Sequence, residues 1–272
     1  MPTYIKFRGV RGSLASPGAQ TSKFGGNTTC LEVRCGKDLI ICDCGTGIYN
    51  LGRELAREKR ALNATILFSH YHWDHMLGLP FFLPIYKKRN RFTMIGRRGL
   101  KRSLHNLFKA PNFPVKFSDL PARIKLVEIP AKKFKIGKIL IDAFDVNHPN
   151  GAFGFKFTFP SKKSAVFISD NGPEMDYRHL IDKISGADVL IHDAQFLPEE
   201  YLRRYKFGHS PFNYILDLAR RSGVKKAFLF HHDPSRTDKE VALIERTAKG
   251  LARRIGMNTK IFAAREGMVI KL

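Results

Sequence analysis

The residues with the clearest chemical potential lie in one short segment, His70-Tyr-His-Trp-Asp-His75. His70 and His72 alternate along an extended or turning stretch, so their imidazoles can point to one side and converge on one cation. Asp74 and His75 follow at the start of the next element, which we expect to be a helix, and can hold a second cation. Imidazole nitrogens and carboxylate oxygens are the ligands that zinc favours in hydrolytic sites. Because packing hardly explains so many ligand-type residues in six positions, the segment predicts a metal centre.

Four cysteines also lie close together, at positions 30, 35, 42 and 44. Their spacings match neither a zinc ribbon nor the disulfide framework of a secreted protein. Cys42 and Cys44 flank Asp43 at an expected strand, where a free cysteine behaves as a small buried hydrophobic residue. We therefore predict buried free thiols rather than a second metal site.

The elements that position the metal segment are predicted from hydrophobic patterning. Short apolar runs followed by polar residues are typical of strands buried on both faces. We expect such strands at residues 39–43, 65–69, 165–170, 188–193 and 227–231, and further strands at residues 4–8, 28–35, 124–129 and 154–159. Helical patterns cover residues 47–60, 211–221 and 237–255, the last opening with a capping box of Thr237 and Glu240. Since no linker, repeat or low-complexity tract interrupts residues 1–272, we expect a single α/β domain.

Composition adds a strong charge bias. The chain has 272 residues, of which 43% are hydrophobic, which is enough for a packed core and excludes wholesale disorder. Its 47 Lys and Arg residues against 24 Asp and Glu residues give a formal net charge of +23 at pH 7. Such a field attracts polyanions and phosphorylated ligands. Twelve basic residues and a single acid lie within residues 84–125, which we call the basic segment.

The basic segment allows two interpretations. Its charges, from Lys87 to Lys125, are interleaved with phenylalanines at positions 92, 108, 113 and 117. On the first interpretation the charges neutralise phosphates while the rings stack on a nucleic acid. On the second, the rings belong to the core and the charges form a solvated face. The sequence leaves both open, with some preference for the second.

The sequence predicts no membrane association. Residues 1–13 lack an apolar run long enough for a signal peptide, and the most apolar stretch, residues 76–86, is broken by Pro80 and Pro84. We therefore expect no transmembrane segment and a cytoplasmic location.

The His-x-His-x-Asp-His string resembles the hallmark of the metallo-β-lactamase-like superfamily. The rest of the chain supplies matching segments in the expected order, around residues 41–47, 146–149, 168–171 and 229–234. The resemblance implies a four-layer αβ/βα sandwich, with two mixed sheets and flanking helices. It also implies two divalent metal ions, most simply zinc, with manganese as an alternative.

The resemblance assigns a role to each matching residue. One metal would be held by His70, His72 and His148, and the other by Asp74, His75 and His231, with Asp170 bridging them. Asp43 would orient the ligand loop through hydrogen bonds. His231 and His232 are adjacent and must point apart if the strand continues, and we prefer His231 as the ligand.

Two features of the resemblance narrow the expected chemistry to phosphodiesters. Diiron oxygen-reducing relatives have a glutamate where His72 stands, and thiolate-using lactamases have a cysteine where Asp170 stands. A site made of histidines and carboxylates suits a dinuclear phosphodiesterase, in which a hydroxide bridging the metals attacks phosphorus. We expect this hydrolase to act on a small or cyclic phosphodiester, and we count Asp74 among its catalytic residues as well as its ligands.

A second pair, Asp193 and His209, resembles the acidic residue and histidine of the tRNA 3′-end-processing and related phosphodiesterase branch. There the carboxylate orients a histidine that acts near the leaving group, which would make Asp193 and His209 catalytic here. The alternative is structural, because Ser210 and Pro211 are typical of a helix start. The segments at residues 9–13 and 24–28 resemble a branch grouped with phosphoribosyl cyclic phosphodiesterases, and suggest Ser13 and Asn27 as substrate contacts. The histidines at positions 105, 179, 192 and 232 are expected to be surface or structural residues.

Other functions stay open at this stage. An RNA-directed endonuclease similar to the tRNA 3′-processing enzymes would need an extended basic track, which Lys87 to Lys125 could supply. A non-catalytic nucleic-acid-binding protein on the same scaffold would also account for the charge of +23. Hydrolysis of a thioester or lactone would use the same metal site.

Overall fold

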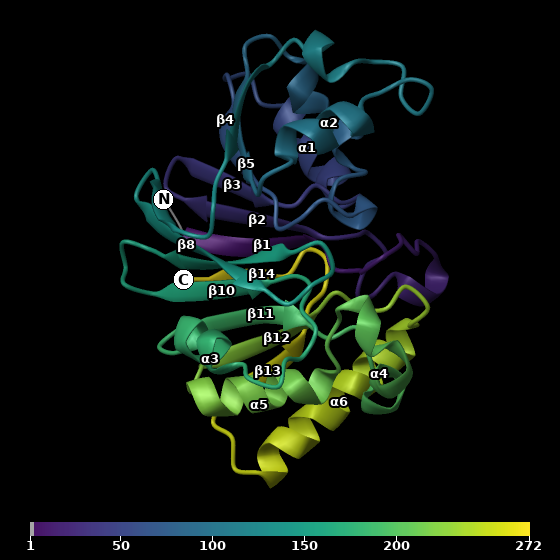
Figure 1. The fold of residues 1–272 in the computed structure, drawn as a ribbon, viewed down its shortest axis with the longest axis vertical. Coiled ribbons are helices and arrows are strands. Elements are labelled where there is room, and N and C mark those ends of the chain that lie inside the picture. Colours follow the sequence, from purple (N-terminus) through teal and green to yellow (C-terminus); the bar gives the residue numbers. More distant parts are fainter. Residues whose placement is uncertain (1–2) are drawn as a thin grey trace.

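The computed structural model describes residues 3–272 and contains two seven-stranded sheets that face each other between layers of helices (Figure 1). The first sheet has the order β14-β1-β2-β3-β4-β5-β6, and the second has the order β13-β12-β11-β10-β9-β8-β7. The strands of the first sheet are β1 (Thr3–Gly9), β2 (Cys30–Cys35), β3 (Asp38–Cys42), β4 (Asn63–Leu67), β5 (Arg91–Gly96), β6 (Arg123–Glu128) and β14 (Val269–Lys271). Those of the second are β7 (Lys133–Ile136), β8 (Ile139–Val146), β9 (Ala152–Thr158), β10 (Ser164–Ile168), β11 (Val189–Asp193), β12 (Lys226–Phe230) and β13 (Lys260–Ala263). The predicted four-layer sandwich with two mixed sheets is confirmed.

The layers are held together by three main groups of buried apolar side chains. The central group joins the inner faces of the two sheets, with Phe7 of β1 packed against Phe228 and Phe230 of β12. The two outer groups lie between each sheet and its helices. The helices are α1 (Ile48–Ala56) and α2 (Leu100–Leu107) on the first sheet, and α3 (Arg178–Ile184), α5 (Phe212–Ser222) and α6 (Asp238–Arg254) on the second, with α4 (Pro198–Arg204) in the connection before α5.

Both sheets contain a parallel half. The pairs β3·β4, β4·β5 and β5·β6 are parallel, and so are β10·β11, β11·β12 and β12·β13. The other pairs are antiparallel. Because loops after parallel strands gather at one edge of a sheet, residues far apart in the chain can meet there.

Each strand and helix that was predicted with a residue range has a counterpart, with ends shifted by a few residues. The capping box is present at the start of α6, where the Glu240 amide donates to Thr237 Oγ1 at 3.3 Å and the Thr237 amide donates to Glu240 Oε2 at 2.7 Å. The sequence did not identify β5, β7, β8, β13 and β14, nor α2, α3 and α4. β7 is only half-buried, so the apolar signal in that part of the chain is weak.

The helix expected after His75 is absent from the described residues. Three short 3-10 turns, Trp73–His75, Leu79–Phe81 and Leu83–Tyr86, take its place. Pro80 and Pro84 explain the difference, because a proline removes the amide that a continuing helix would need.

Two predictions about buried side chains are confirmed. The four cysteines are free and buried, and burial raises the pKa of the Cys30, Cys42 and Cys44 thiols. In the basic segment Phe92 and Phe108 are core residues, each 2% exposed, and the half-buried Phe113 and Phe117 pack against Phe108. These rings therefore contribute to packing, as the second interpretation predicts.

Within residues 3–272, no helix has the length and apolar character needed to cross a membrane. The cytoplasmic location and the single-domain organisation of residues 1–272 stay predictions.

Candidate metal centre

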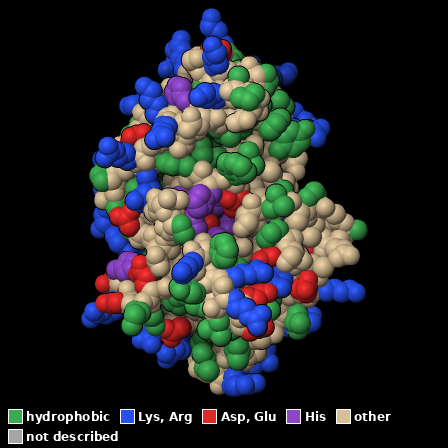
Figure 2. Space-filling view, turned by 45° about the vertical axis from the view of Figure 1, so that its right-hand side comes forward, with side chains coloured by type: hydrophobic (Ala, Val, Ile, Leu, Met, Phe, Trp, Pro, Cys, Tyr) green, Lys and Arg blue, Asp and Glu red, His purple; other side chains and the backbone are tan. Residues whose placement is uncertain are grey.

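The ligand-type side chains lie just beyond the carboxyl ends of strands from both sheets. In the first sheet β3 is followed by Asp43, and β4 is followed by the segment from His70 to His75. In the second sheet the residues that follow strands, or end them, are His148 after β8, Asp170 after β10, Asp193 at the end of β11 and His231 after β12. The sheet arrangement therefore brings distant parts of the chain to one place, at the bottom of a hollow midway along the molecule (Figure 2).

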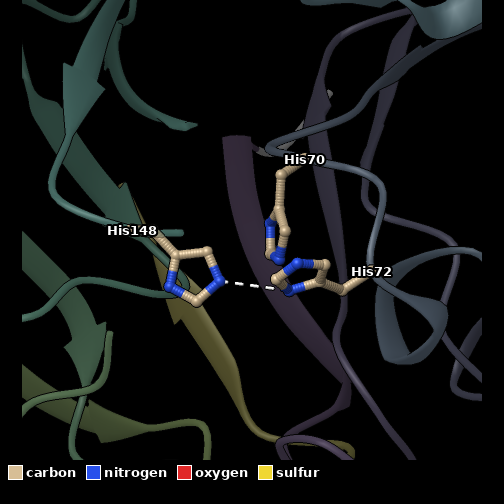
Figure 3. A group of neighbouring side chains, drawn as sticks. All are labelled: His70, His72 and His148. Carbon is tan, nitrogen blue, oxygen red and sulfur yellow. Dashed lines mark hydrogen bonds between the residues drawn. The ribbon is translucent and has the colours of Figure 1, made fainter. Parts of the chain in front are cut away.

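The first ligand group contains His70, His72 and His148, whose ligand atoms all lie within 4.8 Å of one another. His148 approaches from the second sheet and faces the two histidines of the loop after β4 (Figure 3). His148 Nε2 lies 3.1 Å from His72 Nδ1. Burial lowers the pKa of all three imidazoles, and this favours the neutral form that binds metal ions.

The second ligand group contains Asp74, His75, Asp170 and His231, all buried and again within 4.8 Å. Asp74 Oδ2 lies 3.1 Å from the Nε2 atoms of both His75 and His231. Asp170 lies between the two groups, with Oδ1 3.1 Å from His75 Nε2 and Oδ2 3.8 Å from the Nε2 atoms of both His70 and His148. Burial raises the pKa of Asp170, but the neighbouring His231 and His75 outweigh it and hold that pKa well below its usual range.

Four of the histidines are fixed in orientation by a hydrogen bond at their other ring nitrogen. His70 Nδ1 lies 3.0 Å from Ser69 Oγ, and His75 Nδ1 lies 3.0 Å from Asp43 Oδ2. The remaining two contacts are His148 Nδ1 to the Gly208 carbonyl at 2.8 Å and His231 Nδ1 to Gln195 Oε1 at 3.1 Å. Such contacts select the ring tautomer that leaves Nε2 unprotonated and directed at a metal.

The donor set fits a pair of divalent cations. His70 Nε2, His75 Nε2 and Asp170 Oδ1 are buried and have no hydrogen-bond partner. A buried polar atom without a partner costs about 1–3 kcal/mol. The three atoms face the same space, and metal ions there would satisfy all of them. Histidine nitrogens and carboxylate oxygens are also the donors that zinc takes in hydrolytic sites.

Backbone conformation indicates how tightly the site is held. Ser13, Asp43 and His231 have φ angles of 61°, 60° and 58°, in the left-handed region that side chains other than glycine avoid. Each costs about 1–3 kcal/mol and persists only where the surroundings enforce it. Gly12 contributes close packing, because a Cβ atom at this position would lie 2.2 Å from His231 Nδ1.

Asp193 and His209 lie beside the metal-type cluster. His209 Nδ1 is 2.9 Å from Asp193 Oδ2 and 3.8 Å from Asp170 Oδ2. Burial lowers the pKa of His209, but the charge and hydrogen bond of Asp193 outweigh it and, with Asp170 and Asp74, raise the pKa to about 9. Asp193 also accepts hydrogen bonds from the backbone amides of Asn171, Gln195 and Ser210.

The start of α5 differs from the helix start expected at Ser210. Pro211 is the N-cap residue, and no side chain caps the helix. The Ser210 hydroxyl donates instead to the Asn171 carbonyl at 2.5 Å, which ties the His209 loop to the loop after β10. His209 therefore has a carboxylate partner and a place in the cleft wall, and is not explained by helix capping.

Above the cluster lies a cleft of about 390 Å³. It is lined by Ser13, Tyr71, His72, Trp73, Asp74, Asp170 and His209. A neighbouring recess of about 220 Å³ shares His72 with the cleft and is bordered by Arg97 and Arg98 of the basic segment.

The two suggested substrate contacts differ in position. Ser13 lines the cleft, its amide donates to Asp74 Oδ2 at 2.8 Å, and its hydroxyl accepts from Gln195 Nε2 at 3.2 Å. Asn27 is not among the residues that line the cleft, and its side-chain amide donates to Glu266 at 2.9 Å.

The remaining histidines lie outside both ligand groups. His232 points away from the cluster and bonds to the Ala264 carbonyl at 2.8 Å, so the structure brings His231 into the cluster and not its neighbour. His192 is buried behind the site, and His105 and His179 are exposed at the surface.

Three residues with a part in this geometry were not predicted from the sequence. Gln195 links His231 to Ser13, Ser69 contacts both His70 and Asp43, and Gly208 offers its carbonyl to His148. Gln195 and Ser69 each lie within two residues of a predicted site residue, in the same loop after a strand. Gly208 likewise directly precedes the predicted His209. Proximity is therefore a signal that could have found all three, although Gly208 acts through its backbone carbonyl.

Comparisons with known proteins identify the family to which this fold belongs. A family model described as a beta-lactamase superfamily domain matches residues 39–232. The chain is 26% identical over 261 residues to a ribonuclease Z of Lachnoclostridium phytofermentans, covering 78% of this chain and 84% of that protein. A metallo-β-lactamase fold protein from Bacillus subtilis matches over 100% of both chains with a TM-score of 0.75 and 17% identity. A diphosphatase from the PhnP family matches 99% of this chain and 98% of its own, with a TM-score of 0.75 and 16% identity.

Proposed function

The chain belongs to the β-lactamase superfamily, and on that premise we propose that it is a dinuclear metal-dependent phosphodiesterase acting on a small or cyclic phosphodiester. The observation that carries this proposal is the hydrogen-bonded pair of His209 and Asp193 on the wall of the same cleft as both ligand groups. A phosphodiester needs a proton for its departing oxygen, and this pair is suited to supply it. A relative described as a diphosphatase supports a phosphorus-centred reaction.

Two divalent ions, zinc before manganese, would be held by the two ligand groups, with Asp170 contributing to both. In such a site the metals supply a hydroxide at neutral pH and neutralise the charge that grows on the phosphoryl oxygens. Asp74 has two roles, because it contacts His75 and His231 and also accepts a hydrogen bond from the Ser13 amide. Ser13 and Asp74 thereby fix the floor of the cleft on which a phosphate would rest.

His209 would hold the proton for the leaving group. Its Nδ1 faces Asp193, which leaves Nε2 as the atom that donates. With a pKa of about 9 the imidazole is protonated at neutral pH. A general acid in this position contributes about 10²–10⁴-fold to a rate.

The test is hydrolysis of bis(p-nitrophenyl) phosphate by the zinc- or manganese-loaded protein. We expect turnover that is lost with a chelator, returns when metal is added back, and is absent in His72→Ala. His105→Ala is the matched control, since His105 is exposed on α2 and lies outside both ligand groups. Turnover that survives both the chelator and His72→Ala would overturn the proposal.

An RNA-directed endonuclease is the second candidate, because the sequence relative is named a ribonuclease Z. The packing of the phenylalanines in the basic segment weakens this candidate, because Phe92 and Phe108 are buried and Phe113 and Phe117 are half-buried against Phe108. Cleavage of a precursor tRNA, compared with hydrolysis of 2′,3′-cyclic nucleotides by the same preparation, separates the two. A binding protein without turnover has less support, because such a protein would not require two complete ligand groups.

A further inference from the structure

Trp73 is the chain's one tryptophan, and its side chain is 77% exposed. A large amphipathic ring in a globular protein normally contributes by burial. Single exposed hydrophobic side chains are common and need no explanation. The position of Trp73 is not arbitrary, however, because it stands in the metal segment between His72 and Asp74.

The backbone of Trp73 is held rigidly. Its carbonyl accepts hydrogen bonds from the amides of Met76 at 3.0 Å and Leu77 at 2.8 Å, within a 3-10 turn. Because the residues on either side belong to the ligand groups, the Cα atom of Trp73 is fixed relative to the expected metals. The Trp73 backbone therefore lies at a fixed distance from any phosphate bound at the cluster.

The indole lines the mouth of the cleft and has no aromatic or cationic partner within residues 3–272. The floor of the cleft is polar, whereas hydrophobic side chains border the hollow that contains the histidines (Figure 2). Ser13 of the cleft wall is followed by Leu14, whose side chain is 66% exposed. A ligand that enters would therefore meet charged groups at the floor and an unpaired aromatic face at the rim.

Cationic groups lie nearby on the other side of His72. Arg97 is paired with Asp145 and lies over the Phe153 ring at 4.6 Å, so it is committed to the fold. Arg98 is exposed, has no ion pair within the described residues and borders the recess next to the cleft. The surroundings thus combine a free aromatic face with a free positive charge, as ligands with both a flat ring and phosphates require.

We propose that Trp73 stacks on the base of a nucleotide substrate, so that the enzyme prefers nucleotide phosphodiesters to sugar phosphodiesters without a base. This inference rests on the proposed phosphodiesterase function and names its substrate class. Stacking of a base on an aromatic side chain changes affinity by about 5- to 100-fold.

A matched pair of substrates tests the inference: 2′,3′-cyclic AMP and the 2′,3′-cyclic phosphate of methyl riboside, which has the same ring phosphodiester and no base. We expect kcat/KM to be about tenfold or more higher for the adenine compound. In Trp73→Ala the ratio of the two kcat/KM values should fall to near one. The value should decrease for the adenine compound and stay unchanged for the methyl riboside. Trp73→Phe should keep most of the preference, and Leu77→Ala, an exposed apolar control on the same loop, should keep all of it.

Binding gives an independent measurement, because all tryptophan emission of the chain comes from Trp73. With the metal-loaded protein we expect AMP to quench this emission saturably, and ribose 5-phosphate to have little effect at the same concentration. Equal responses to the two ligands, or a substrate ratio near one in the unaltered protein, would overturn the inference while leaving the phosphodiesterase intact. If AMP quenches but no phosphodiester is hydrolysed, the proposed function fails and base recognition by Trp73 stands. The fluorescence measurement does not depend on Trp73→Ala folding.

Discussion

The metal segment, residues 70–75, and the basic segment, residues 84–125, are both conspicuous in the sequence, but they contribute very differently to the site. Four residues of the metal segment point into the two ligand groups. The basic segment lies beside it on the first sheet, and only Arg97 and Arg98 border the recess that contains His70 and His72. Lys87 and Arg89 direct their donors to the carbonyls of Ala56 and Glu58 instead.

The difference shows what each kind of signal can specify. Spacing within a short loop determines which side chains converge, so the metal segment predicts chemistry. A charge excess determines only the long-range field, which attracts anions without choosing a contact. The variants below test this contrast, beginning with the ligand groups.

The largest effect is expected for Asp170→Asn. Asp170 lies between the two ligand groups, and an amide offers one neutral acceptor where the carboxylate offers two charged ones. We expect the metal content, measured by elemental analysis, to fall below two ions per chain. Activity should fall by more than the roughly 100-fold loss typical when a partner of a ligand is removed. Two bound ions with full activity would contradict the bridging position.

The next effect is expected for Asp193→Asn, which keeps the shape of the side chain and removes its charge. Asp193 supports the protonated form of His209, so its loss should lower the His209 pKa from about 9 by about 1–3 units. Because the acid must be protonated to donate, the alkaline fall of kcat/KM should move to lower pH, and kcat at pH 7 should fall by up to about tenfold as the protonated fraction of His209 decreases. A pH–rate profile measures both. An unchanged alkaline limb would show that His209 is not the acid.

Gln195→Ala tests a contact that holds a ligand without belonging to the ligand set. Gln195 Oε1 lies 3.1 Å from His231 Nδ1 and should fix that ring. We expect metal affinity, measured by competition with a chelator, to fall by about 10- to 100-fold. Gln20→Ala is the matched control, because Gln20 is exposed in the turn Ala19–Thr21, away from the cleft. Equal affinities for the two variants would mean that His231 is positioned by its backbone alone.

The sequence was sufficient for the fold and the hydrolase class, which are confirmed, because the metal segment carries a specific pattern and the strands that precede each ligand are strongly apolar. It was insufficient where side-chain identity carries little information. The contact of Gly208 with His148 is made by a backbone carbonyl, whose partner the sequence does not specify, and β7 is half-buried. The basic segment was ambiguous for a related reason. Its phenylalanines are spaced as core residues, and composition cannot distinguish a buried ring from an exposed one.

The smallest effect is expected within the basic segment, where Arg98→Glu and Lys116→Glu make the same change of charge at two distances from the site. Arg98 borders the recess beside His72, whereas Lys116 is exposed and lines neither the cleft nor the recess. We expect Arg98→Glu to raise KM for an anionic substrate by about fivefold at low salt, and this effect to shrink as salt screens the charge. Lys116→Glu should change KM by less than about twofold. If the two variants behave alike for a small substrate but both weaken RNA cleavage, the segment acts as a whole, and the RNA-directed candidate gains over the small phosphodiester.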